Sequence, residues 1–120
     1  MRLTRFSDYA LRLLIYVASR PGQRTTIADA AKAYGISRNH LMKVAHRLAL
    51  AGLLKPNRGR TGGLSLGRPA AEISLGDVLR ATEPDFALVG CMAGESCVVS
   101  EQCRLPQAFD AAIAAFLESA

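Results

Sequence analysis

The chain of 120 residues has no tryptophan, only three cysteines and no apolar run long enough to cross a bilayer. Its apolar stretches are interrupted by Arg, Asp or Glu well short of the roughly 20 residues that a membrane-spanning helix needs. The start of the chain lacks the apolar core of a signal peptide, so we expect a cytoplasmic protein. A hydrophobic content of 50% with 21% charged residues is typical of a globular chain. The length suits one domain with one function.

Acidic residues are nearly absent from the first half of the chain. Residues 1–71 hold 13 Lys or Arg and two acids, whereas residues 72–120 hold two Arg and eight acids. No acid lies between Asp29 and Glu72. A basic block of this kind fits polyphosphate binding, because each Lys or Arg placed at a phosphate releases condensed counterions. A merely solvated basic face is the alternative.

The spacing of apolar residues predicts three helices in the basic half, over about 5–19, 27–34 and 38–51. Thr25 or Thr26 can cap the second helix, and Gly35 ends it. Ser37 can cap the third helix, and Gly52 ends it. Two short helices joined by a turn with glycine, the second of them capped and basic, indicate a helix-turn-helix.

A hairpin is predicted next, with strands over 53–55 and 64–66. The connecting loop holds three glycines and two arginines, which lets the backbone approach a phosphate chain while the guanidinium groups reach it or the minor groove. An ordinary flexible hairpin loop would explain the glycines but not the arginines. We therefore predict a mainly α-helical fold with a small β-hairpin wing, a winged helix-turn-helix.

The acidic half begins with a short helix over 75–82, which Ser74 can cap and which ends before Pro84. Residues 86–103 show no clean period and are interpreted as a loop. From Leu105 to the end of the chain, apolar residues again follow helical spacing, and too little chain remains to cover them. We expect the same helix of a second subunit to do so, which makes the protein a homodimer. The chain then divides into a DNA-binding region (1–85), a cysteine-rich loop (86–104) and a dimerisation helix (105–120).

Candidate DNA contacts concentrate on the third predicted helix and the wing. In a helix-turn-helix, the N-terminal end of the second helix enters the major groove, where Arg can bond guanine and Asn adenine. The candidates for base contacts are Ser37, Arg38, Asn39, His40 and Lys43. The candidates for phosphate or minor-groove contacts are Arg47, Lys55, Arg58, Arg60 and Arg68. His40 could also be a simple exposed polar residue.

Three cysteines, Cys91, Cys97 and Cys103, are separated by five residues each in the predicted loop. Thiolates are the soft ligands that iron-sulfur clusters and zinc prefer, and even spacing suits one chain wrapping a polynuclear cluster. The pattern departs from the paired knuckles of structural zinc. A fourth ligand would have to come from a carboxylate, another oxygen or a partner subunit. A zinc site or a metal-free thiol switch remains as an alternative.

The residues quoted so far resemble the Rrf2 family of iron-sulfur winged-helix repressors. The resemblance rests on "MRLTRFSDYALRLLIYVAS", "YGISRNHLMKV", "RGRTGGLSLGRP", "ISLGDVLRATEP" and the three cysteines. The second of these stretches is similar to the nitric-oxide-sensing NsrR branch. The IscR branch uses a His three residues past the last cysteine as a ligand, and Pro106 stands there in this chain.

The resemblance implies a repressor whose [4Fe-4S] cluster is held by the three cysteines and by Asp8 of the partner subunit. Nitric oxide would be the signal that releases it from its operator. A [2Fe-2S] cluster that responds to redox or iron-sulfur status is the alternative within the family. Asp8 on its own could equally be a first-turn acid that the helix dipole favours. No nucleophile paired with a base and no phosphate-binding glycine loop before a helix is recognised, so an enzyme is not expected.

Overall fold

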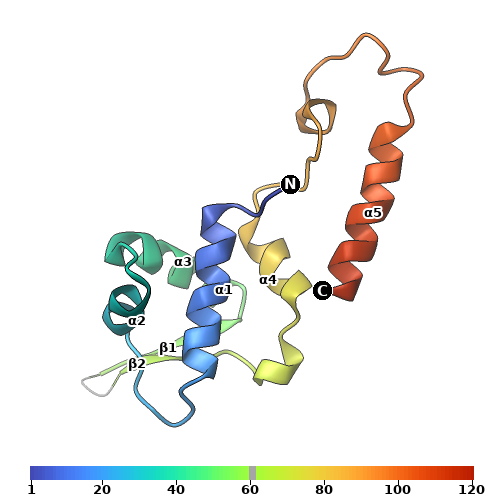
Figure 1. Ribbon diagram of the computed structural model, residues 1–120. Coiled ribbons are helices and arrows are strands. Elements are labelled where there is room, and N and C mark those ends of the chain that lie inside the picture. The colour runs from blue at the N-terminus through green and yellow to red at the C-terminus, as the bar shows by residue number, and fades with distance from the viewer. Residues whose placement is uncertain (60–61) are drawn as a thin grey trace.

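The computed structural model describes residues 1–59 and 62–120, and it confirms a mainly helical chain with a two-stranded antiparallel hairpin (Figure 1). Three helices precede the hairpin and two follow it. The elements are α1 (Arg5–Ala18), α2 (Ile27–Tyr34), α3 (Arg38–Leu50), β1 (Leu54–Asn57), β2 (Gly63–Leu66), η1 (Ala70–Glu72), α4 (Leu75–Thr82), η2 (Gly90–Ala93) and α5 (Leu105–Ser119).

Side-chain caps set the starts of the first four helices. Thr26 rather than Thr25 caps α2: its hydroxyl accepts from the Asp29 N–H. The Asp29 carboxylate in turn accepts from the Thr26 N–H, which completes a capping box. Ser37 accepts from the backbone of α3, and Ser74 forms a second capping box at α4. The helix-turn-helix bend follows from Gly35, whose φ of 67° lies in the left-handed region that a residue with a Cβ rarely adopts.

The hairpin pairs Leu54 with Leu66 and Asn57 with Gly63. Its first strand therefore starts one residue later and runs two residues further than predicted. Leu53 instead closes the end of α3, where its N–H bonds the Leu48 carbonyl, and its side chain is buried. The wing candidate Arg60 lies outside the described residues.

The base of the wing is tied to the loop between α1 and α2. The Leu64 N–H donates to the Thr25 carbonyl at 2.7 Å, and Arg24 Nε donates to the Gly62 carbonyl at 2.6 Å. These bonds hold the hairpin at a defined angle to the helix-turn-helix.

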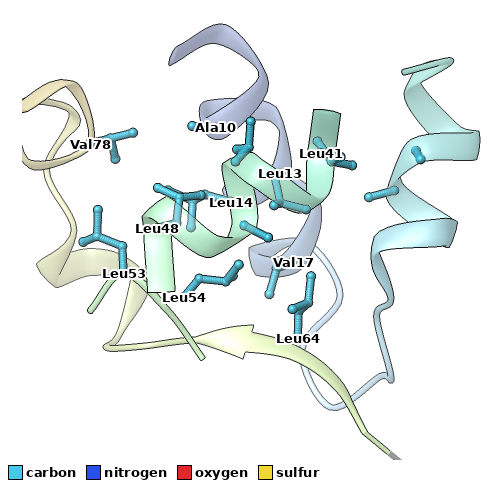
Figure 2. Close-up of a cluster of buried hydrophobic side chains, with 14 residues drawn as sticks. Ala10, Leu13, Leu14, Val17, Leu41, Leu48, Leu53, Leu54, Leu64 and Val78 are labelled. Atoms are coloured by element: carbon cyan, nitrogen blue, oxygen red, sulfur yellow. The ribbon is translucent and has the colours of Figure 1, made fainter. Parts of the chain in front are cut away.

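The hydrophobic core lies between α1, α3, α4 and the hairpin (Figure 2). Burying one leucine side chain contributes about 1.5–3 kcal/mol relative to leaving it exposed, so this cluster dominates the stability of the winged helix. Its largest fully buried apolar members are Leu13, Leu41, Leu48, Leu53, Val44 and Val78.

The last helix stands apart from this core (Figure 1). Helix α5 packs on α4, and the Leu75 N–H donates to the Ala120 carbonyl at 2.9 Å, yet no residue of α5 is buried. A helix that is apolar on most of its surface needs more cover than α4 provides. Within the described ranges, the helices are too short or too polar to traverse a lipid bilayer.

Candidate DNA-binding surface and cysteine loop

Helix α3 has one face in the core and one in solvent. Leu41, Val44 and Leu48 are completely buried. The base-contact candidates Ser37, Arg38, Asn39 and Lys43, together with Arg47, are exposed. The core face therefore fixes the orientation of α3, and the cationic side chains project away from the molecule, as binding in a groove requires.

His40 differs from the other candidates because its ring packs on α1. It lies edge-on to Tyr9, with ring centroids 4.9 Å apart, and 6.3 Å from Phe6. The residue is half-buried, so the ring joins α3 to the first turns of α1. Met42 and His46, which the sequence analysis did not select as contacts, are exposed on α3 instead. Their spacing of four residues from Arg38 and from each other was the available signal.

The wing presents Lys55 and Arg58 to solvent. Gly59, directly after Arg58, has a φ of 97°, which suits a tight turn at this point. Arg68 also lies at the surface, but it is 3.9 Å from the Asp77 carboxylate, so its charge is shared with α4. Lys55 and Arg58 are thus exposed cations of the wing that form no ion pair with the described residues.

Asp8 lies in the first turn of α1 and is paired with Arg12. The Arg12 Nε donates to one carboxylate oxygen at 2.9 Å and a terminal nitrogen donates to the other at 3.2 Å. This hydrogen bond, and then the charge of Asp8, raises the pKa of Arg12 above its ordinary value. The same guanidinium lies 6.0 Å from the Tyr9 ring centre and 5.8 Å from that of Tyr34. Exposed pairs of this kind are weak, so the ion pair with Arg12 stabilises the position of Asp8 only slightly.

The start of α1 is fixed to the end of α4. The Thr4 N–H donates to Glu83 Oε1 at 2.8 Å, and the hydroxyl groups of Ser7 and Thr82 lie 2.7 Å apart in the interior. The cysteine loop begins directly after these α4 residues. The turn that carries Asp8 is therefore attached to the point where the loop leaves the core.

The three cysteines are free thiols in this loop. Cys91, within η2, and Cys103 are half-buried, while Cys97 is exposed. Soft thiol donors with no disulfide partner fit an iron-sulfur cluster chemically. Across residues 1–59 and 62–120, however, no three His, Cys, Asp or Glu side chains lie close enough to share a metal ion. The three thiols are therefore suitable ligands for a cluster, but the loop of a single chain does not bring them close enough together to bind one.

An apolar groove of about 300 Å³ lies between the first residues, the start of the cysteine loop and α5. Its lining includes Leu3, Phe86, Leu88, Ile113 and Phe116. The groove lies next to α5, none of whose residues is buried.

Comparison with known proteins places the chain among transcriptional regulators. A family model described as Rrf2, an iron-dependent transcriptional regulator, matches residues 3–119. The oxidised form of CymR from Staphylococcus aureus is 30% identical, with a TM-score of 0.75 over 99% of this chain and 88% of that one. CymR of B. subtilis, described as its global cysteine regulator, is 25% identical, with a TM-score of 0.74 over 99% and 91%. IscR from T. potens, at 23% identity and a TM-score of 0.71 over 99% and 81%, shares the fold.

Proposed function

Because the chain belongs to the Rrf2 family of transcriptional regulators, we propose that it is a homodimeric repressor that releases its operator in response to nitric oxide. Members of this family are regulators rather than enzymes, and they bind DNA as dimers. The protein acts in the cytoplasm, where its operator is found.

DNA binding is supported above all by the charge and exposure of α3. Arg38, Asn39 and Lys43 project from a helix whose opposite face is buried, in a part of the sequence without acids. Arg58 of the wing is exposed as well. In a dimer, two such units would contact half-sites about 34 Å apart, or a multiple of that distance.

Dimer formation is supported by α5 and the apolar groove next to it. No residue of α5 is buried in the single chain, and Ile113 and Phe116 line the groove. Covering this surface with the same surface of a second copy would remove it from water, which the hydrophobic effect favours.

As ligands of a [4Fe-4S] cluster we propose Cys91, Cys97 and Cys103 of one subunit and Asp8 of the partner subunit, as in the NsrR branch. When bound, the cluster would supply an iron held by the carboxylate of Asp8, and because carboxylate is a harder and weaker ligand for iron than thiolate, this iron would be the one most open to a diatomic gas. To serve as this ligand, Asp8 has to exchange Arg12 for the iron. The loop has to bring its three thiols together.

The contacts of α1 explain how a change at the loop would reach the DNA. Thr82 and Glu83, at the root of the loop, hold Ser7 and Thr4. Two residues further along α1, Tyr9 packs on His40 of α3. A shift of the loop would thus tilt α1 and alter the spacing of the two α3 helices in the dimer.

The test is operator binding by anaerobically purified protein during a titration with nitric oxide. Affinity is expected to fall as the visible absorption of the cluster disappears. Mössbauer spectroscopy or native mass spectrometry before the titration separates a [4Fe-4S] from a [2Fe-2S] cluster. Affinity that stays constant while the absorption is lost would contradict nitric oxide sensing, yet leave DNA binding in place.

A metal-free thiol switch is the second candidate, because the three thiols are free and apart in the single chain. A relative with 30% identity is known in an oxidised form. This candidate predicts an iron-free protein whose operator affinity changes on treatment with peroxide and recovers with a thiol reductant. Replacing Cys97, the exposed thiol, with Ser would remove that response.

A further inference from the structure

Met42 is an exposed methionine in the middle of α3, with 49% of its surface accessible. Its neighbours Leu41 and Val44 are fully buried, so Met42 points away from the core that they help to form. A single exposed apolar residue needs no explanation by itself. The position of Met42 on the helix is what indicates a function.

Met42 lies among the residues that face DNA in the proposed function, on which this inference rests. It follows Arg38 by four residues and Asn39 by three, and it precedes His46 by four, so these side chains share one side of the helix. Arg38, Asn39 and His46 are all exposed. A protein partner that covered Met42 would have to desolvate this basic surface as well, whereas the DNA polyanion is complementary to it.

The major groove offers one apolar group at its base edges, the C5-methyl group of thymine. Arginine and asparagine read hydrogen-bonding groups and are matched to guanine and adenine. Methionine is flexible and polarizable, which lets it fit an irregular apolar surface. We infer that Met42 contacts the methyl group of a thymine in each half-site and so specifies a base that Arg38 and Asn39 do not read.

The experiment removes the methyl group from the DNA and the thioether from the protein. A duplex is selected from a random pool with the anaerobically purified wild type. Each thymine of one half-site is then replaced in turn with deoxyuridine, which keeps the hydrogen-bonding groups and lacks the methyl. At one thymine the wild type is expected to lose about fourfold in affinity, the factor that burial of one methyl group typically contributes.

At that thymine, Met42→Ala is expected to bind the two duplexes equally, while Met42→Leu keeps most of the difference. Leu50→Ala is the matched control, because Leu50 is 72% exposed on the same helix, two turns further on. It should keep the wild-type response to deoxyuridine. Both positions of change, Met42 and Leu50, are at the surface, so the three variants should retain the thermal unfolding midpoint of the wild type.

In one outcome, the protein binds a selected duplex in preference to random DNA, while Met42→Ala cancels the deoxyuridine effect at none of its thymines. That result would overturn this inference and leave the proposed function in place. So would a Leu50→Ala variant that cancels it equally well. A protein that selects no duplex over random DNA would refute the proposed function and this inference with it.

Discussion

The hydroxyl pair of Ser7 and Thr82 is expected to stabilise the contact between α1 and α4 in a way that a double-mutant cycle can measure. Ser7 is 0% and Thr82 6% exposed, and their oxygens lie 2.7 Å apart. The Thr82 hydroxyl also donates to the Val78 carbonyl at 2.8 Å, which uses its single proton. The Ser7 hydroxyl must therefore donate to Thr82.

This direction sets the expected magnitudes. Ser7→Ala removes the donor and leaves the Thr82 proton bonded, which should cost about 1 kcal/mol of unfolding free energy. Thr82→Val leaves the buried Ser7 proton without its acceptor, because the Thr4 hydroxyl, 3.3 Å away, donates to the Ser7 oxygen; this should cost about 1–2 kcal/mol. The double variant has neither group and should be about as stable as Thr82→Val, so the coupling free energy is about 1 kcal/mol.

Urea unfolding followed by circular dichroism, at one protomer concentration for all four proteins, measures the cycle. Ser19→Ala is the control, because the Ser19 hydroxyl bonds a backbone carbonyl at the exposed end of α1 and should matter little. Effects of the two single changes that simply add, to within about 0.3 kcal/mol, would refute the hydrogen bond as the link between the helices.

Three further predictions concern α5, α4 and the wing. A Cβ at Gly76 would collide with the Leu117 backbone oxygen, so Gly76→Ala should displace α5 and shift sedimentation toward monomer; an unchanged dimer would show that this contact is unimportant. Hydrogen bonds from the Ser74 backbone, and then from its hydroxyl, lower the pKa of Asp77 below 3.8. Its stabilising effect is therefore present above that pH and lost as the pH falls through the lowered value, so urea midpoints across acid pH should depend less on pH in Asp77→Asn. Arg58→Ala should weaken operator binding similarly for all sequences and reduce the slope of log affinity against log salt by about 1; a change in base preference would contradict a phosphate contact.

Much of the fold was predictable because the ends of the helices are set by residues close to one another in the sequence. Ser37 and Ser74 accept from the backbone three residues on, as an N-cap does, and Gly35 takes the left-handed conformation that it alone adopts freely. These interactions involve neighbours in sequence, so spacing is enough to find them. The first strand is the exception. Leu53 does not begin it, because its side chain is buried in the core and its N–H bonds the Leu48 carbonyl at the end of α3.

The site was less predictable because its residues are assigned by tertiary contacts. Nothing local shows that His40 packs on Tyr9 and Phe6 rather than projecting with Asn39. The pair of Asp8 and Arg12 could have been predicted from its spacing of four residues on one helix, whereas spacing does not reveal that the three cysteines stay apart. The four residues of η2 give the loop one turn of local structure, but bringing the three thiols together depends on a group or a subunit beyond one chain.

The separation of charge along the chain also has a physical consequence for how the molecule reaches its target. The basic winged helix and the acidic stretch made of the cysteine loop and α5 lie on different sides of a molecule 60 Å long (Figure 1), and their formal charges are opposite. Such a particle carries a large dipole moment, and the field of a duplex exerts a torque on it before contact. The molecule would thus turn α3 toward the DNA while it is still diffusing. The rate of productive encounters should therefore fall steeply with added salt, which screens the field of the duplex.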